Sequence, residues 1–312
     1  MSDFCAPSAT GVLGSGLGLV LASRMGVAVV APDYLGLDGL GTPSDQLHPY
    51  VVAEPTALSS LDAARAAMNL VEREGTATQP DLSRSVLWGA SQGGHAALWS
   101  DRYAGAYAPE ITIAATVAAV PPTDTLALVE HGVVEFSDTT EGIVGYTLAT
   151  ADWYGLDPTE ALLPEIAASA REVLDTTCDV LDAGGDVDAV EELFTEVLRS
   201  APGQWETVLP EWGCAFRGSS LTETAIVREA DAPILMVLGE EDRLVPPGPP
   251  RADAGWLCDE GAAVELLECA GLDHEDAGLQ TLDRQVEWVL ARLAGEPLAS
   301  PCSLPPAQEC SQ

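Results

Sequence analysis

The sequence predicts an α/β fold: a mostly parallel sheet, flanked by helices on both faces, with an inserted helical cap. Short, uniformly apolar segments have the composition of strands that are buried on both sides. Amphipathic segments lie between them and are expected to form the covering helices. A long stretch without strand segments, residues 127–230, predicts the cap.

The predicted elements alternate along the chain. The clearest helix is 54–74, because Ala57, Leu61, Ala64 and Met68 recur at helical spacing. The full set comprises strands 27–31, 85–88, 111–120, 234–238 and 264–267, and helices 16–25, 54–74, 92–103 and 276–293.

We expect the chain to divide into two parts of one core, a cap and a tail. These are the first core part (1–126), the cap (127–230), the second core part (231–295) and a Pro- and Cys-containing tail (296–312). Cap helices are expected at 158–181 and 186–200. The cap aromatics are expected to pack in its own core, although a cap can also supply an apolar pocket. They are Trp153, Tyr154, Phe194, Trp205, Trp212 and Phe216.

Composition limits the partners. A chain of 312 residues with 47% hydrophobic content is long enough to bury a large core. Its net charge is -36, from 49 acidic residues against 13 basic ones, all of them Arg. This charge would repel nucleic acid and anionic membrane surfaces, so neither is an expected partner. We interpret the acidic residues as a solvated surface.

The seven cysteines indicate disulfides rather than a metal site. None forms a C-x-x-C pair, and no His has metal-ligand spacing to them. The spacings of Cys302 with Cys310 and of Cys258 with Cys269 suit disulfides, which form in an oxidising compartment. Inert buried thiols are the alternative. The start of the chain has no signal-peptide pattern, and no apolar run is long enough to span a membrane.

The segment Gly89-Ala90-Ser91-Gln92-Gly93 has the pattern G-x-S-x-G, between a predicted strand and a predicted helix. This context is that of a nucleophile elbow, a tight turn that needs small neighbours such as Gly89, Gly93 and Gly94. The helix start would aim the Gln92 N–H at a developing oxyanion. Ser91 is therefore the predicted nucleophile; a glycine-rich turn without catalysis is the alternative.

A serine nucleophile needs a base, and His274 is the best placed of four histidines. It follows the last predicted strand, as a chain order of Ser, Asp and His requires. His48 and His131 are expected in loops. His95, four residues after Ser91, is expected to pack in the helix.

Asp242 is the predicted acid, because the pattern G-x-x-D-x-x-V-P follows strand 234–238. Loops after parallel strands meet at one sheet edge, so this loop should approach Ser91. Glu240 and Glu241 are neighbours whose chemistry would also serve. The order Ser91, Asp242, His274 predicts an α/β-hydrolase that performs acyl transfer.

The chain also resembles the secretory lipase family, which includes the fungal type-A lipase. The resemblance implies an extracellular carboxylic ester hydrolase that acts on acylglycerols or simpler esters without a cofactor. It carries Ser91, Asp242 and His274 as the triad. The matching segments are Cys5-Ala6-Pro7-Ser8, Val29 to Tyr34, His48-Pro49-Tyr50, Leu61 to Ala66, Leu87 to Ala97, Tyr107 to Glu110 and Pro121-Pro122.

One departure from the family concerns the oxyanion site. In the family, a segment resembling H-G-T-T-G lies shortly before the Cys-Ala-Pro-Ser segment and supplies the second oxyanion donor. Met1 stands only four residues before Cys5, so this donor and its strand are expected to be absent. We hypothesise that Met1 is an internal methionine and that the natural protein starts upstream, with a signal peptide. The alternatives are a weakly active or inactive protein that binds apolar ligands, and a peptidase or acyltransferase with the same triad.

Overall fold

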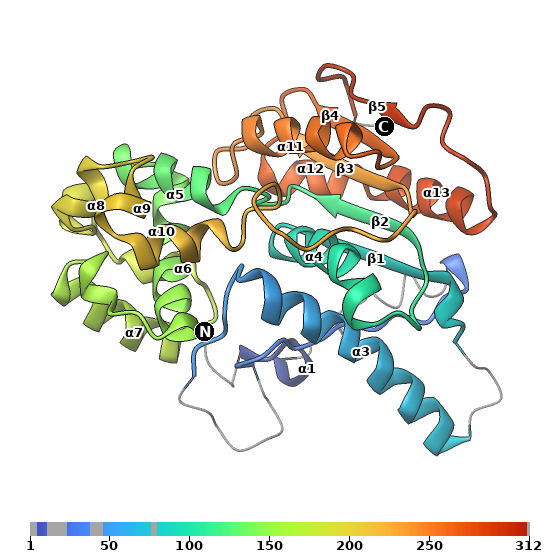
Figure 1. The fold of residues 1–312 in the computed structure, drawn as a ribbon, viewed down its shortest axis with the longest axis horizontal. Coiled ribbons are helices and arrows are strands. Elements are labelled where there is room, and N and C mark those ends of the chain that lie inside the picture. Colours follow the sequence, from blue (N-terminus) through green and yellow to red (C-terminus); the bar gives the residue numbers. More distant parts are fainter. Residues whose placement is uncertain (1–4, 11–23, 38–45, 76–79, 311–312) are drawn as a thin grey trace.

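A computed structural model describes residues 5–10, 24–37, 46–75 and 80–310 of the chain (Figure 1). One lobe contains a five-stranded sheet with its helices, and a second, helical lobe lies beside it. The strands are β1 (Ser85–Ala90), β2 (Ile113–Ala119), β3 (Ile234–Gly239), β4 (Val264–Cys269) and β5 (Cys302–Ser303). The helices of the sheet lobe are α1 (Pro7–Thr10), α3 (Ala53–Glu74), α4 (Gln92–Tyr107), α11 (Gly248–Asp259), α12 (His274–Gln280) and α13 (Leu282–Leu293).

The sheet has the order β1-β2-β3-β4-β5, and every neighbouring pair is parallel. Its side chains alternate between two buried faces, as β3 illustrates. Ile234 and Met236 pack in one cluster with residues of α3, α4 and α11, whereas Leu235 and Val237 pack in another with Trp288 of α13. Helices therefore cover both faces, and the predicted fold class is confirmed.

The four longer strands confirm the predicted segments 85–88, 111–120, 234–238 and 264–267, with ends that differ by one or two residues. The predicted helix 276–293 is two helices, α12 and α13, that meet at Thr281. The Thr281 hydroxyl donates to the Ala277 carbonyl at 2.7 Å and accepts from Gln285 at 2.8 Å. Such side-chain bonds compete with the helical ladder and favour the break.

The predicted strand 27–31 is wrong. Residues 27–31 form no sheet pairing in the described structure, and Val29 and Val30 are 44% and 45% exposed. A strand is held by its ladder of hydrogen bonds, and within the described ranges β1 is an edge with no strand on its outer side. Apolar composition alone therefore does not fix this segment. Most of the predicted helix 16–25 lies outside the described residues.

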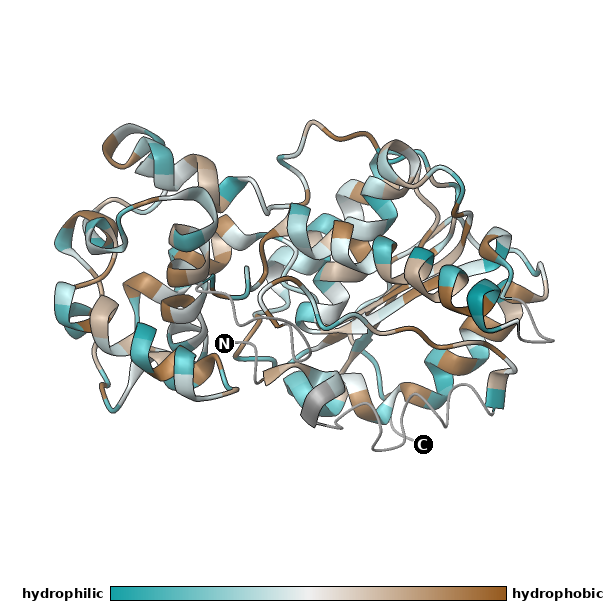
Figure 2. Cartoon of the chain, turned by 90° about the horizontal axis from the view of Figure 1, so that it is seen from below, coloured by the Kyte–Doolittle hydropathy of each residue, from teal (hydrophilic) through white to brown (hydrophobic). Residues whose placement is uncertain are grey.

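The second lobe is the helical cap, inserted between β2 and β3 (Figure 2). The predicted helices 158–181 and 186–200 are too long, and two further helices that the sequence pattern did not predict lie before residue 158. The cap contains α5 (Thr125–Val134), α6 (Asp138–Tyr154), α7 (Pro164–Thr176), α8 (Glu196–Ser200), α9 (Trp205–Val208) and α10 (Pro210–Arg217), with 3₁₀ turns at Pro158–Glu160, Leu181–Gly184 and Val190–Glu192. The domain limits stated above stay a prediction.

Helix α6 escaped prediction because it is buried nearly all round. Its residues from Thr139 to Ala151 are almost all inaccessible, so they show no amphipathic period. Among the cap aromatics, Trp153 and Tyr154 remain partly exposed. The other four are fully buried in the cap core, as predicted: Phe194, Trp205, Trp212 and Phe216. In the described part of the chain, no helix has both the length and the apolarity to cross a bilayer.

Three disulfides confirm that the cysteines form disulfides, but Cys258 and Cys269 each bond to a tail cysteine and not to one another. Cys5 pairs with Cys178 and joins the first described segment to the cap. The other two tie the tail to the second part of the core: Cys258–Cys302 to α11 and Cys269–Cys310 to the end of β4. Cys214 is the free, exposed cysteine.

The two tail disulfides allow a matched stability experiment. They close loops of similar length, with sequence separations of 44 and 41 residues. Replacing either pair by serines is expected to lower the free energy of unfolding by about 2–4 kcal/mol, because the unfolded chain gains freedom. Urea unfolding without reductant measures this change. A loss below 0.5 kcal/mol (roughly a typical surface substitution) for both variants would contradict the tail's structural role.

Candidate functional site

Ser91 lies in a strained turn between β1 and α4. It has φ +54 and ψ -120, a conformation that few residues other than glycine adopt. The Ser91 N–H donates to the Ala119 carbonyl at 2.8 Å, which ties the turn to the end of β2. Ser91 precedes the first residue of α4, where helix N–H groups have no partner within the helix. This is the geometry expected of a nucleophile elbow.

Two of the three elbow glycines are required by close backbone approach. A Cβ at Gly89 would lie 2.1 Å from the Gly93 carbonyl oxygen, and one at Gly94 would lie 2.8 Å from the Ala119 carbonyl oxygen. A Cβ at Gly93 meets nothing within 4 Å. The prediction that Gly93 must be small is therefore wrong: the Gly93 backbone is what a Cβ at Gly89 would strike, and a Cβ at Gly93 itself would have room.

Asp242 and His274 are in direct contact. Asp242 follows β3, His274 is the first residue of α12, and Asp242 Oδ2 lies 2.7 Å from His274 Nδ1. The other carboxylate oxygen of Asp242 accepts from the N–H groups of Leu244 at 3.0 Å and Val245 at 2.8 Å. These bonds fix the carboxylate, which is only 5% exposed, so that it orients the imidazole.

The two neighbouring carboxylates point elsewhere. Glu240 and Glu241 are exposed, and Glu240 Oε2 accepts from the Gly271 N–H at 3.1 Å. Glu240 thus stabilises the loop before His274 through this hydrogen bond, and its carboxylate is not bonded to the imidazole in the described structure. The geometry favours Asp242 over both alternatives that the sequence leaves open.

The second ring nitrogen of His274 is free of the contact with Asp242. His274 Nε2 is buried and has no hydrogen-bond partner among the described residues. The helix that begins with His274 reaches the elbow, since a Cβ at Gly278 would lie 3.9 Å from the Cβ of Ala90, beside Ser91. An imidazole held at Nδ1 by a carboxylate and open at Nε2 can accept a proton from a nucleophile.

The remaining histidines have different surroundings. His131 is exposed on α5, so its predicted loop position is wrong; the cap helix that holds it was not predicted. His95 packs within α4 as expected, and its Nδ1 lies 3.0 Å from the Pro122 carbonyl oxygen. His48, in a loop as expected, is buried against Gln92, a contact that sequence reasoning missed. Burial lowers the pKa of both His48 and His95 to about 4.

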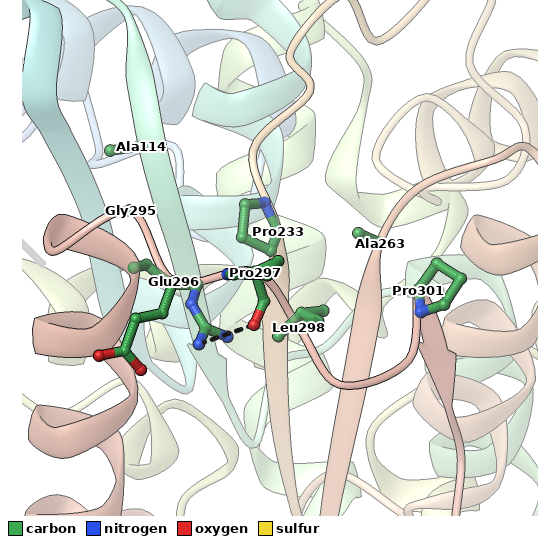
Figure 3. A pocket seen from close by; sticks show the side chains of 9 residues that line it. Ala114, Pro233, Ala263, Gly295, Glu296, Pro297, Leu298 and Pro301 are labelled. Carbon is green, nitrogen blue, oxygen red and sulfur yellow. Dashed lines mark hydrogen bonds between the residues drawn. The ribbon is translucent and has the colours of Figure 1, made fainter.

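A separate apolar hollow of about 360 Å³ lies at the other end of the sheet (Figure 3). It opens beside the starts of β2, β3 and β4, whereas Ser91 and Asp242 follow strand ends. Its lining includes Ala114, Pro233, Ala263 and Leu298. No group of three or more His, Cys, Asp or Glu side chains suited to a metal ion occurs in the described ranges.

Similar solved structures share this fold. The rice cell wall degrading esterase LipA from Xanthomonas oryzae matches with a TM-score of 0.63 at 20% identity, over 83% of this chain and 68% of that one. Lipase A of Candida antarctica in its closed state matches with a TM-score of 0.73 at 16% identity, over 99% and 71% of the two chains. No match was found among curated proteins.

The family comparison covers the elbow, the cap and the acid and histidine loops together. The model described as "Secretory lipase" matches residues 15–301, which is most of the chain. The resemblance seen in the sequence motifs is thereby confirmed, and the chain belongs to the secretory lipase family.

Proposed function

We propose that this protein is a carboxylic ester hydrolase that uses Ser91, His274 and Asp242. The observation that carries the proposal is the 2.7 Å contact between Asp242 and His274, beside the strained turn that bears Ser91. Membership of the secretory lipase family supports a hydrolase of the lipase and esterase type. The triad and the substrates are the parts that we propose.

The reaction begins when Ser91 Oγ attacks the ester carbonyl carbon and His274 Nε2 accepts the hydroxyl proton. The tetrahedral oxyanion accepts a hydrogen bond from the Gln92 N–H at the start of α4. Its collapse breaks the ester bond, and His274 returns the proton to the departing alcohol. Water then attacks the acyl-enzyme with His274 as base, which releases the acid and restores Ser91. Asp242 holds Nδ1–H and stabilises the imidazolium throughout.

The proposed substrates are acylglycerols or simpler esters, with no cofactor. For the acyl group we propose a place against the cap, whose apolar core has partly buried side chains packed against it, among them Tyr50, Leu126 and Leu156. The three disulfides and the family support an extracellular location. The charge of -36 disfavours anionic interfaces, so uncharged esters are the expected substrates.

A panel of p-nitrophenyl esters from acetate to palmitate tests this function. We expect Ser91-dependent turnover of at least one ester, with a burst of nitrophenol wherever deacylation is the slower step. A p-nitroanilide of the same acyl group controls for peptidase activity. Binding of the esters without turnover at any chain length would contradict a hydrolase and favour a ligand-binding protein.

A further inference from the structure

A buried histidine outside the proposed triad contacts the residue that follows the nucleophile. His48 Nε2 lies 2.5 Å from Gln92 Nε2, and His48 Nδ1 lies 2.9 Å from the Leu35 carbonyl oxygen. A carbonyl only accepts, so Nδ1 carries the hydrogen and Nε2 presents a lone pair. The Gln92 amide must then donate to it. The bond to Leu35 thus fixes the tautomer of His48, and the contact at Nε2 fixes the orientation of the Gln92 amide.

The surroundings of His48 keep it neutral and fixed. It is 2% exposed, and burial lowers its pKa to about 4, so Nε2 remains an acceptor at neutral pH. The Tyr34 ring stacks on the imidazole at 5.5 Å between centroids, and the Tyr50 ring meets it edge-on at 6.3 Å. The backbone of His48 is also closely packed, since a Cβ at Gly36 would lie 2.7 Å from it.

The loop that carries His48 is held by the cap. The Leu47 N–H donates to Asp152 Oδ2 of α6 at 2.8 Å, and Arg171 of α7 donates to the other oxygen of that carboxylate at 2.7 Å. Leu47 and Val51 pack in the cap core, on either side of His48. A continuous set of contacts therefore runs from α7 and α6 through this loop to the first residue of α4.

On the basis of the function proposed above, we propose that His48 is a positioning residue that couples the cap to the oxyanion donor Gln92. The N–H of Gln92 can stabilise an oxyanion only while the first turn of α4 keeps its orientation. A Gln92 side chain released from His48 is free to rotate, and its amide could then compete for Ser91 Oγ. Holding it away favours the transition state more than substrate binding, so the effect falls on kcat rather than KM.

Two substitutions at His48 separate its two hydrogen bonds. His48→Asn keeps a donor close to the position of Nδ1, for Leu35, but is too short to reach Gln92. His48→Gln carries an amide oxygen about as far out as Nε2, where it accepts from Gln92. We expect kcat on a short p-nitrophenyl ester to fall about tenfold in His48→Asn, with KM nearly unchanged, because one hydrogen bond is lost. His48→Gln is expected to stay within about threefold of the wild type.

His95 supplies the matched control. It is also buried and also bonded through Nδ1 to a carbonyl, that of Pro122, but its Nε2 has no partner in the described structure. His95→Asn therefore removes a buried imidazole without removing a contact to Gln92, and kcat should stay near the wild-type value. A double-mutant cycle of His48→Asn and Gln92→Met tests the contact between the two side chains. The kcat of the double variant should be no lower than that of the slower single variant.

The outcomes separate this proposal from the function on which it rests. If wild-type turnover does not depend on Ser91, the function fails, and the same cycle measured by urea unfolding then decides whether the pair is coupled. If turnover does depend on Ser91, three results would each overturn the positioning role. These are a His48→Gln variant as slow as His48→Asn, additive effects in the cycle, or equal losses of kcat in His48→Asn and His95→Asn.

Discussion

Ser91→Ala is expected to lower kcat for ester hydrolysis by about 10⁴-fold or more, because the proposed acyl-enzyme forms on the Ser91 hydroxyl. KM should change little, since the hydroxyl contributes mainly to the chemical step. Initial rates on the best p-nitrophenyl ester, with enzyme concentrations raised to reach the residual activity, measure the change.

Ser100 provides the matched serine control. It lies on the same helix, α4, is fully buried, and its hydroxyl has no hydrogen-bond partner in the described ranges. Ser100→Ala makes the same chemical change nine positions away from the elbow and should leave kcat within about threefold of the wild type. Turnover that persists undiminished in Ser91→Ala would exclude the proposed mechanism.

Asp242→Asn is expected to lower kcat by about 10⁴-fold at neutral pH, because an amide neither stabilises the imidazolium nor enforces the required tautomer. Asparagine has nearly the same shape as aspartate. It can also keep the bonds to Leu244 and Val245 through its amide oxygen, so the loop should fold normally. Thermal unfolding of the variant checks this point beside the kinetic measurement.

The adjacent carboxylates are the controls for Asp242. Glu241→Gln should be nearly silent, since the Glu241 side chain is exposed and the contact with Leu272 is made by its backbone N–H, which the substitution keeps. Glu240→Gln retains an oxygen that can accept from Gly271, so it should lose at most about threefold. A loss in Glu240→Gln equal to that in Asp242→Asn would assign the acid to Glu240.

The sequence predicts the parts of the site that depend on local pattern. The elbow is fixed by a five-residue motif between a strand and a helix, and Gly89 and Gly94 then follow from sterics. His274 follows from chain order. The sequence left Asp242 open against two glutamates because all three are carboxylates within three positions. Only the bond to His274 and the two backbone N–H donors distinguish it.

Features that depend on contacts between distant residues could not be predicted from the sequence. Strand 27–31 has strand composition, but composition does not supply the neighbouring strand that would pair with it. Helix α6 is buried on nearly all sides, so its sequence lacks the amphipathic period that would have predicted it. The contact of His48 with Gln92 joins residues 44 positions apart, and no local pattern marks it. The one signal in the sequence is the rarity of histidine, of which the chain has four.

Activation of Ser91 by His274 and Asp242 can be measured by covalent labelling. A fluorophosphonate reacts with an activated serine hydroxyl, and peptide mass spectrometry identifies the modified residue. We predict one adduct per chain on Ser91, formed much more slowly in His274→Ala and Asp242→Asn but at the wild-type rate in Glu241→Gln. Labelling of another residue, or labelling of Ser91 at the same rate without His274, would contradict the proposed activation of Ser91.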